Sequence, residues 1–307
     1  MSQQQSLLSV EHLSLHARSG QAILDDVSFT LGAGKVLALV GESGSGKTMA
    51  ARASMGLLPK GIEPVGGRVD FEGRDILALA EPQLRALRGP AIGMVFQEPM
   101  VSLNPAMTIG EQLTEALCLH EKIGSQEALT RAAQMLEKVQ IEDPHTCLSA
   151  FPHQFSGGMR QRIMLASVML LRPKLLIADE PTTALDSLTQ REVLELMMEL
   201  TRTQGTSVLL ITHNLGLVAQ YADDMAVLER GKLVEAGAVK TILKSPKRDY
   251  TRKLIDALPK RDFSRPPVPD KQPLISATSV SVTFGGAGNA FSSAAEKKAV
   301  QDVSLFV

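Results

Sequence analysis

Cysteine is scarce in this sequence, which has Cys118 and Cys147 and no others among its 307 residues. Two cysteines make neither a disulfide framework nor a metal cluster, and they are typical of a protein in the reducing cytosol. The sequence also lacks a charge of one sign, because 32 basic and 33 acidic residues leave a formal net charge of −1. This balance gives no indication of a nucleic-acid-binding surface or of an anchor to an anionic membrane. We therefore expect no nucleic acid among its partners.

Long hydrophobic runs are missing as well. The longest apolar stretch, residues 163–171, has about half the length that a membrane-spanning helix needs. The first five residues have neither a basic start nor an apolar core, so we expect no signal peptide. Any work at a membrane is therefore expected to go through a partner. The length suggests about two domains.

What the sequence does contain is a phosphate loop of the GxxxxGK[ST] type. The loop consists of Gly41, Glu42, Ser43, Gly44, Ser45, Gly46, Lys47 and Thr48. Apolar residues 36–40 before it predict a buried strand, and residues 49–58 predict a helix that stops at Pro59. The N–H groups of the loop are expected to surround a phosphate chain. Lys47 is expected to reach the β- and γ-phosphates, and the Thr48 hydroxyl to ligate Mg²⁺.

A phosphate loop alone does not distinguish a kinase from a GTPase or an ATPase, so the polar residues downstream matter. The strand predicted at residues 175–178 ends in two carboxylates, Asp179 and Glu180. Asp179 is expected to hold the Mg²⁺ shell, and Glu180 is the natural general base for a hydrolytic water. The next predicted strand ends at His213, and a histidine at the end of a strand is by itself more often an ordinary polar residue than a catalytic one.

The alternation of strands and helices predicts an α/β fold with a largely parallel sheet. Residues 108–170 are mostly helical in pattern and long enough for a separate subdomain. Residues 259–273 are rich in proline and predict a linker. Beyond the linker, residues 274–282 parallel residues 7–15, and residues 299–305 parallel residues 23–29. We therefore expect the tail to be the start of a second, truncated copy of the domain.

Six motifs in order, GESGSGKT, FQEP, SGGMRQR, LLIADEP, TALD and LLITHN, resemble the nucleotide-binding domain of ABC transporters over about residues 7–260. The resemblance implies a P-loop core, an antiparallel β subdomain and an inserted helical subdomain. It implies ATP and Mg²⁺ as cofactors, with Gln97 joining Thr48 and Asp179 at the metal and sensing the transmembrane partner. It further implies that His213 contacts the γ-phosphate and stabilises the charge that develops on it while Glu180 polarises the water. It also implies that a second ABC domain, in the same chain, a homodimer or a paralogue, supplies a signature loop in trans. The signature here is Ser156, Gly157, Gly158 and Met159, and Asp186 would communicate across the dimer.

Two positions depart from the family pattern. Met159 stands where the family usually has a glutamine, and a methionine cannot donate that hydrogen bond. The family often stacks an aromatic side chain on adenine in the first hairpin, where this sequence has Ala17. The neighbouring His16 is a candidate substitute for that aromatic, and the alternative is an ordinary strand residue.

Residues 97–105, QEPMVSLNP, and residues 250–254, YTRKL, are similar to the dipeptide, oligopeptide and nickel import subfamily. Residues 150–162 also resemble glutathione-importer ATPases, which are tandem fusions. The resemblance implies an ATPase on the cytoplasmic side of the bacterial inner membrane, docked as a peripheral subunit on integral membrane permeases. A periplasmic or extracellular solute-binding protein would be an indirect partner. The transported substrate would be a peptide or a similar small solute, such as glutathione or a nickel chelate. The alternatives are a non-transport ABC ATPase of the translation or DNA-repair type, or a protein that binds ATP without turnover.

Overall fold

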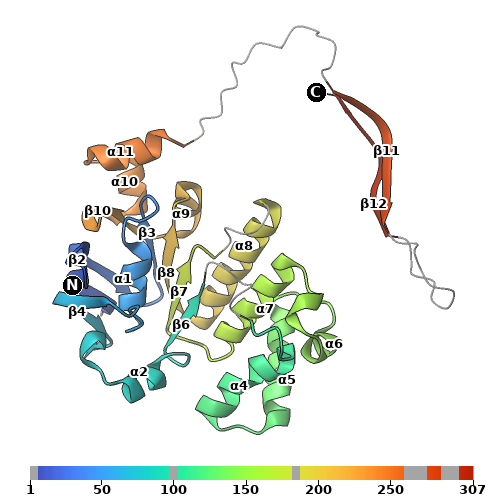
Figure 1. Cartoon of the computed structure of the whole chain (residues 1–307), viewed down its shortest axis with the longest axis horizontal. Helices are drawn as coiled ribbons and strands as arrows, with labels where there is room; N and C mark the ends of the chain where they lie inside the picture. The colour runs from blue at the N-terminus through green and yellow to red at the C-terminus, as the bar shows by residue number, and fades with distance from the viewer. Residues whose placement is uncertain (1–5, 97–102, 182–186, 259–274, 285–296, 307) are drawn as a thin grey trace. The chain divides into compact units, whose positions relative to one another are not determined.

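A six-stranded sheet forms the centre of the computed structural model, which describes residues 6–96, 103–181, 187–258, 275–284 and 297–306 (Figure 1). The strand order is β10-β9-β3-β8-β7-β6, and all neighbours run parallel except β10 and β9. The strands are β3 (Val36–Val40), β6 (Ile92–Val95), β7 (Leu175–Asp179), β8 (Ser207–Thr212), β9 (Asp224–Glu229) and β10 (Lys232–Ala238). Because parallel strands end at the same edge of a sheet, the residues that follow β3, β7 and β8 are brought together.

The two faces of this sheet belong to different parts of the core. In β7, Leu176 and Ala178 join the cluster of the helical side, whereas Leu175 and Ile177 join the cluster that holds the antiparallel strands. This division follows from the alternation of side chains along a strand. It also explains why β7 is a continuous apolar run, since every residue of the strand is buried.

A second, antiparallel sheet has the order β2-β1-β4-β5. Its strands are β1 (Ser6–Ala17), β2 (Ala22–Gly32), β4 (Ile62–Phe71) and β5 (Arg74–Asp75). Buried residues of β1 such as Leu13 and Leu15 pack in the same cluster as Leu37 and Leu39 of β3. The antiparallel sheet thereby backs the strand that leads into the phosphate loop.

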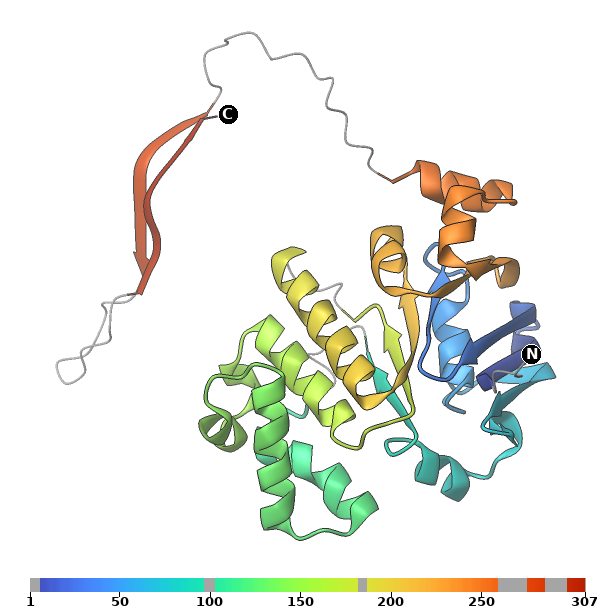
Figure 2. The same cartoon turned by 180° about the vertical axis from the view of Figure 1, so that it is seen from behind.

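The helices of the first unit divide between the two sides of the parallel sheet. They are α1 (Lys47–Ala53), α2 (Glu81–Leu87), α4 (Ile109–Glu121), α5 (Ser125–Lys138), α6 (Pro144–Ser149), α7 (Gly157–Met169), α8 (Ser187–Gln204), α9 (Leu215–Tyr221), α10 (Val239–Lys244) and α11 (Asp249–Asp256), with 3₁₀ turns at Ile76–Ala78 and Pro152–Gln154. Seen from behind, α7 and α8 lie on the side of the sheet opposite α1 (Figure 2). Among the described residues, none of the helices is both long and apolar enough to cross a membrane.

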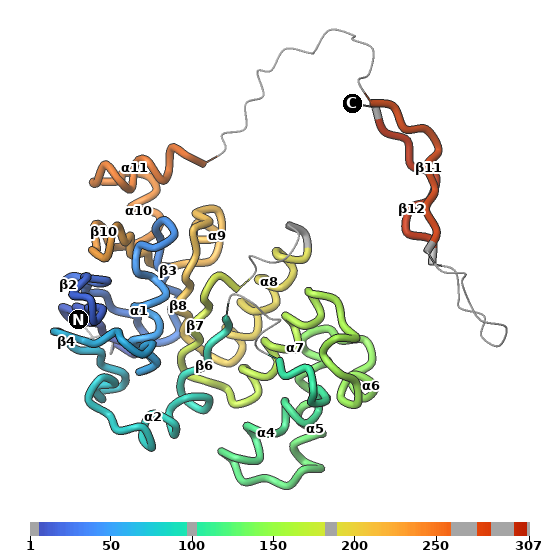
Figure 3. Tube along the Cα trace, viewed as in Figure 1, coloured from blue at the N-terminus to red at the C-terminus, as the bar shows by residue number. Residues whose placement is uncertain are grey.

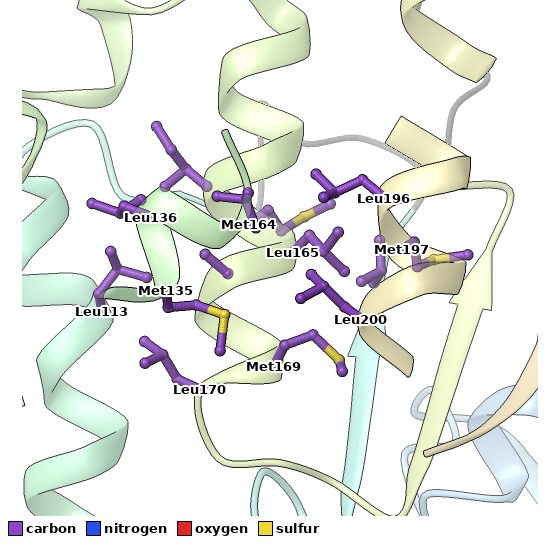
Figure 4. Close-up of a cluster of buried hydrophobic side chains, with 14 of the residues drawn as sticks. Leu113, Met135, Leu136, Met164, Leu165, Met169, Leu170, Leu196, Met197 and Leu200 are labelled. Atoms are coloured by element: carbon purple, nitrogen blue, oxygen red, sulfur yellow. The ribbon is translucent and has the colours of Figure 1, made fainter. Parts of the chain in front are cut away.

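The helices α4 to α7 form a group between β6 and β7, and Figure 3 traces the chain out through them and back. Methionine and leucine side chains of α5, α7 and α8 interlock where this group meets α8 (Figure 4). Thr108 starts α4 with a capping box, because its hydroxyl accepts from Glu111 N–H and the Glu111 carboxylate accepts from Thr108 N–H. The predicted α/β class, with its parallel core, antiparallel sheet and inserted helices, is the fold that the structure has.

One helix differs in extent from the sequence expectation. The helix after the phosphate loop ends at Ala53 instead of continuing to residue 58. Gly56 adopts a left-handed φ of 62°, and the Arg88 guanidinium donates to the carbonyls of Met55 and Gly56 at 3.0 and 2.7 Å. An arginine more than thirty residues along the chain thus donates hydrogen bonds to two carbonyl groups of the turn that follows the helix.

The strand β4 begins at Ile62 and runs through a glycine pair, Gly66 and Gly67. Gly67 lies against a bulge of β1, where a Cβ atom at this position would meet the His12 carbonyl oxygen at 2.4 Å. Glycine therefore allows β4 to continue past the bulge instead of starting after it.

The chain divides into two units, Met1–Leu258 and Pro259–Val307, and the described part of the second is a hairpin of β11 (Ser276–Phe284) and β12 (Lys297–Phe306). The hairpin repeats local details of β1 and β2. Ser279 and Asp302 have φ values of 53° and 50°, and the residues that correspond to them in the sequence repeat, His12 and Asp26, have 51° and 57°. Two side-chain to backbone hydrogen bonds also recur. Ser304 Oγ accepts from Ser279 N–H at 2.9 Å as Ser28 Oγ accepts from His12 N–H at 2.8 Å, and Ser281 Oγ accepts from Asp302 N–H as Ser14 Oγ accepts from Asp26 N–H.

Candidate nucleotide-binding site

The phosphate loop connects β3 to α1 and packs tightly against two other strands. Gly46 has a φ of 101°, and a Cβ atom there would lie 2.5 Å from Leu24 Cδ2 in β2. At Gly41 a Cβ atom would meet the Leu228 carbonyl oxygen of β9 at 2.2 Å. Gly46 requires glycine for its left-handed backbone, and Gly41 requires it because a backbone carbonyl occupies the space that a Cβ atom would need.

Lys47 is drawn into the loop that contains it. Only 5% of the residue is exposed, and its Nζ donates to the carbonyl oxygens of Gly41 and Glu42, each at 2.8 Å, and to Ser45 Oγ at 3.4 Å. Burial lowers the pKa of this ammonium group, and the nearby carboxylates of Glu180 and Asp179 act against that change. The loop therefore has a buried cation already in place.

Thr48, in the first turn of α1, meets Asp179 at the end of β7. The Thr48 hydroxyl donates to Asp179 Oδ1 at 3.1 Å, and Asp179 is itself buried at the end of β7. The pKa of Asp179 is raised, first by burial and also by the charge of Glu180, while the bond from Thr48 and the charges of Arg52 and Lys47 oppose the rise. A buried carboxylate beside a hydroxyl is an oxygen donor set that suits Mg²⁺, which in nucleotide sites takes one or two protein ligands and completes its shell with phosphate and water oxygens. The described residues hold no group of three or more His, Cys, Asp or Glu side chains that could bind a metal ion.

Glu180 and His213 form a second pair beside the first. His213 Nδ1 lies 3.2 Å from Glu180 Oε1, with the glutamate side chain 17% exposed and the histidine 61% exposed. Glu180 has a φ of 44°, a left-handed backbone that is unusual for a residue other than glycine, and its N–H donates to the Ile211 carbonyl at 3.0 Å. Both residues line a cavity of about 180 Å³. Such strain persists where the surrounding structure enforces it, often at functional sites.

The four signature residues lie at the start of α7. Ser156 caps this helix, because its Oγ accepts from Met159 N–H at 3.3 Å. Gly158 packs against α8, where an added Cβ atom would lie 2.5 Å from Thr189 Cγ2. The Met159 side chain is 37% exposed. Among the described residues, no hydrogen bond joins these four residues to the phosphate loop, so a role toward a partner's nucleotide stays a prediction.

Three of the predicted site residues, Gln97, Asp186 and His16, are not connected to the site by the contacts described above. Gln97 and Asp186 lie outside the described residues, as do residues 98–102 of the stretch that is similar to the import subfamily. His16 is half-buried in β1 and pairs with Ala22 of β2. Ala22 lies two residues before Leu24, whose side chain packs against Gly46 of the loop. The part of His16 in adenine binding stays a prediction.

Two residues that were not among the predicted site residues form hydrogen bonds at the site in the structure. Gln161 is buried in α7 and donates to the carbonyl of Pro181, the residue after Glu180. A glutamine on the buried face of a helix was the available signal, since buried polar groups need partners. Tyr250 accepts a hydrogen bond at 3.1 Å from the backbone N–H of Glu42, and nothing in the local sequence indicates that contact.

Residues 24–183 match the family described as "ABC transporter". The chain belongs to this family. Residues 151–219 also match an AAA domain family. The solved structure of the ATP-binding cassette MJ0796, a dimer in a post-hydrolysis state bound to ADP and Pi, superposes with a TM-score of 0.66 at 25% identity and covers 76% of this chain and 98% of its own.

Curated relatives of this ABC protein are named as transport ATP-binding proteins. The peptidoglycan transport ATP-binding protein YejF of Agrobacterium fabrum is 48% identical over 86% of this chain and 50% of its own length. The oligopeptide transport ATP-binding protein OppD of Bacillus subtilis is 48% identical over 78% of this chain and 67% of its own. The glutathione import ATP-binding protein GsiA of Shigella dysenteriae is 43% identical over 83% and 42%.

This ABC chain therefore spans about half the length of two of these relatives and two thirds of the other. The family predicted from the six motifs is confirmed, and so is the fold class.

Proposed function

We propose that this ABC protein binds ATP with Mg²⁺ and hydrolyses it to energise solute import through a membrane transporter. The observation that carries the proposal is the placement of Thr48 on Asp179 and of His213 on Glu180, at the ends of strands that neighbour the phosphate loop. The two pairs supply what phosphoryl transfer to water needs, namely a metal-binding pair and a base next to a charge-stabilising group.

Each residue would act through the chemistry of its own side chain. Thr48, Asp179 and Gln97 would hold Mg²⁺, which neutralises charge on the phosphate oxygens. Glu180 would take a proton from the water that attacks the γ-phosphorus while the bond to the bridging oxygen of ADP breaks. Lys47 and His213 would stabilise the negative charge that moves onto the phosphate oxygens.

A second ABC domain would complete the site. The signature residues Ser156 to Met159 of each domain would face the nucleotide of the other, with Asp186 between the two sites. The MJ0796 cassette, which is similar to this chain, is a dimer, and this supports the arrangement. Met159 is exposed and would contribute its backbone rather than a side-chain donor.

The solute class follows from the relatives rather than from the site. Because they are named for peptidoglycan, oligopeptide and glutathione transport, we propose a peptide or a similar small solute as the cargo. The names favour transport over a role in translation or DNA repair. The chain would sit as a peripheral subunit on the cytoplasmic side of the inner membrane, on integral permease subunits, with a solute-binding protein as an indirect partner.

The test replaces the proposed base. Glu180→Gln keeps the shape of the side chain but removes the base, so turnover should fall by about 10²-fold or more while ATP binding survives and ATP-bound dimers accumulate. Glu199→Gln, on an exposed position of α8, makes the same chemical change away from the site and should leave turnover intact. Steady-state phosphate release and size-exclusion chromatography with ATP measure both effects. Turnover of the Glu180→Gln protein near the wild-type rate would remove Glu180 as the base.

The import part has its own test. Cells that carry Glu180→Gln in the native gene should lose uptake of labelled peptide, of labelled glutathione or of a nickel chelate. Unchanged uptake of all of these solutes would contradict the proposed cargo class.

We also propose that residues 274–307 begin a second ABC domain behind a linker at residues 259–273. The support is the recurrence in β11 and β12 of the left-handed residues and hydrogen bonds of β1 and β2. The corresponding residues of β2, Val27 and Phe29, are buried, whereas Val303 and Leu305 of β12 are 50% and 56% exposed. An intact mass near twice 33.0 kDa for the protein from its native host would support the proposal, and a mass of 33.0 kDa would contradict it.

A further inference from the structure

The helix α11 reaches the phosphate loop from the far end of the first unit. The Glu42 N–H donates to the Tyr250 hydroxyl oxygen at 3.1 Å, and the carbonyl of the same peptide unit, Gly41 C=O, accepts from Lys47 Nζ at 2.8 Å. A peptide unit is planar and rigid. Tyr250 and Lys47 therefore hold one rigid group by its two ends, and the orientation that Tyr250 gives the N–H fixes the carbonyl that Lys47 uses.

Tyr250 is itself held firmly in place. Its ring packs, together with Leu254, against a buried cluster that includes Val40, the last residue before the loop. The start of α11 is tied to β10, because the Glu235 carboxylate accepts from the N–H groups of Lys247 and Arg248 at 2.9 and 3.3 Å. A hydroxyl mounted in this way can orient a loop peptide without a large entropic cost of its own.

The charge state of the hydroxyl fits this contact. Burial raises the pKa of Tyr250 above its ordinary value, so the group is a neutral phenol at physiological pH and can accept from an N–H while keeping its own proton.

We propose that Tyr250 is a positioning residue for nucleotide binding, whose hydroxyl holds the Gly41–Glu42 peptide in the orientation that the loaded loop needs. The inference rests on the proposed function, because it concerns the affinity of the same site for ATP. A phenylalanine leaves the Glu42 N–H without this acceptor and lets the peptide turn, so ordering the loop becomes part of the cost of binding. The helix α11 is also the last helix of the first unit, which ends at Leu258.

The experiment uses the two tyrosines of the sequence as a matched pair. Tyr250→Phe removes the hydroxyl at the loop, and Tyr221→Phe removes one at the end of α9, where the ring packs on the helical cluster. The dissociation constant of a fluorescent ATP analogue with Mg²⁺ is measured on the full chain, together with KM, kcat and the melting temperature without nucleotide. Tyr250→Phe should raise the dissociation constant and KM about three- to tenfold, the factor that corresponds to one neutral hydrogen bond, with a smaller change in kcat. Tyr221→Phe should stay within about twofold of the wild type on the same scale.

A third variant separates positioning from packing. Leu254→Ala loosens α11 against the same cluster but keeps the Tyr250 hydroxyl. The inference is overturned if Tyr250→Phe binds as tightly as wild type, or if Leu254→Ala weakens binding as much as Tyr250→Phe does. A wild-type chain that binds the analogue but does not hydrolyse ATP would contradict the proposed hydrolysis and leave the comparison of affinities valid. A wild-type chain that binds no ATP would overturn both.

Discussion

The contact between Gly158 and Thr189 gives the sharpest prediction for stability, because a single methyl group decides it. A Cβ atom at Gly158 would lie 2.5 Å from Thr189 Cγ2, far inside van der Waals contact. Threonine is branched at Cβ and rotates poorly in a helix, so the methyl group cannot simply turn away. Either α7 and α8 separate or a side chain leaves its rotamer, and such overpacking costs about 1–3 kcal/mol.

The helix propensity of alanine partly offsets the cost of this overpacking. Alanine is a better helix former than glycine by about 1 kcal/mol in a helix interior, and by less in the first turn where Gly158 lies. We therefore expect Gly158→Ala to lower the free energy of unfolding by about 1–2 kcal/mol, which in a domain of this size lowers the melting temperature by about 2–8 °C.

The double variant tests the cause. Thr189→Ser keeps the hydroxyl and removes only the methyl group that clashes, so Gly158→Ala combined with Thr189→Ser should melt close to Thr189→Ser alone. The coupling energy of this cycle, measured by differential scanning calorimetry, should be about 1 kcal/mol or more. Additive effects, or a Gly158→Ala protein as stable as wild type, would refute the argument that this methyl group sets the distance between α7 and α8.

Two further predictions concern the loop and the cysteines. Gly46→Ala should abolish ATP binding in an equilibrium titration, because it adds a clash with Leu24 to a left-handed backbone. Gly44 has a φ of 80° and no atom within 4 Å of an added Cβ, so Gly44→Ala should lose less affinity for ATP. Equal losses of affinity in the two variants would contradict the role of the clash. Burial raises the pKa of Cys147 to about 11, so at pH 8 a thiol reagent should modify half-buried Cys118 and leave Cys147 unmodified until the protein unfolds. Modification of both cysteines at equal rates in the folded protein would contradict the protection of Cys147. Because the folded state holds the Cys147 proton more tightly than the unfolded state, the contribution of this thiol to stability is present below the unfolded pKa of about 8.5 and is lost as pH rises toward 11.

The parts of the site that the sequence could predict are those that follow from strand ends. Asp179 and Glu180 directly follow an apolar run, and His213 follows the next, so parallel pairing alone brings them to the loop. Asp179 was expected beside Thr48 at the metal, whereas the order of the strands in the sheet, which places His213 beside Glu180, is known only from the structure. The roles assigned to them remain predictions that the variants above test.

What the sequence could not predict depends on partners far along the chain. Arg88 binds the carbonyls of the turn that follows α1, and Tyr250, a residue of the last helix of the unit, accepts a hydrogen bond from the loop peptide at Glu42. The left-handed backbone of Glu180 is equally hidden, since a carboxylate at a strand end has no local reason to adopt it. Such features arise from tertiary packing, which periodicity and spacing do not describe.

The self-contained bonding of Lys47 has a consequence for which molecules can enter the loop. An ammonium group has three N–H donors, and here all three have acceptors within the loop itself. A ligand therefore gains nothing by offering another neutral oxygen, since it would only exchange one such bond for another. An oxygen that carries negative charge forms the stronger bond and wins the exchange. We therefore expect the loop to bind polyphosphates and to discriminate against nucleosides and sugars, which offer it only neutral oxygens.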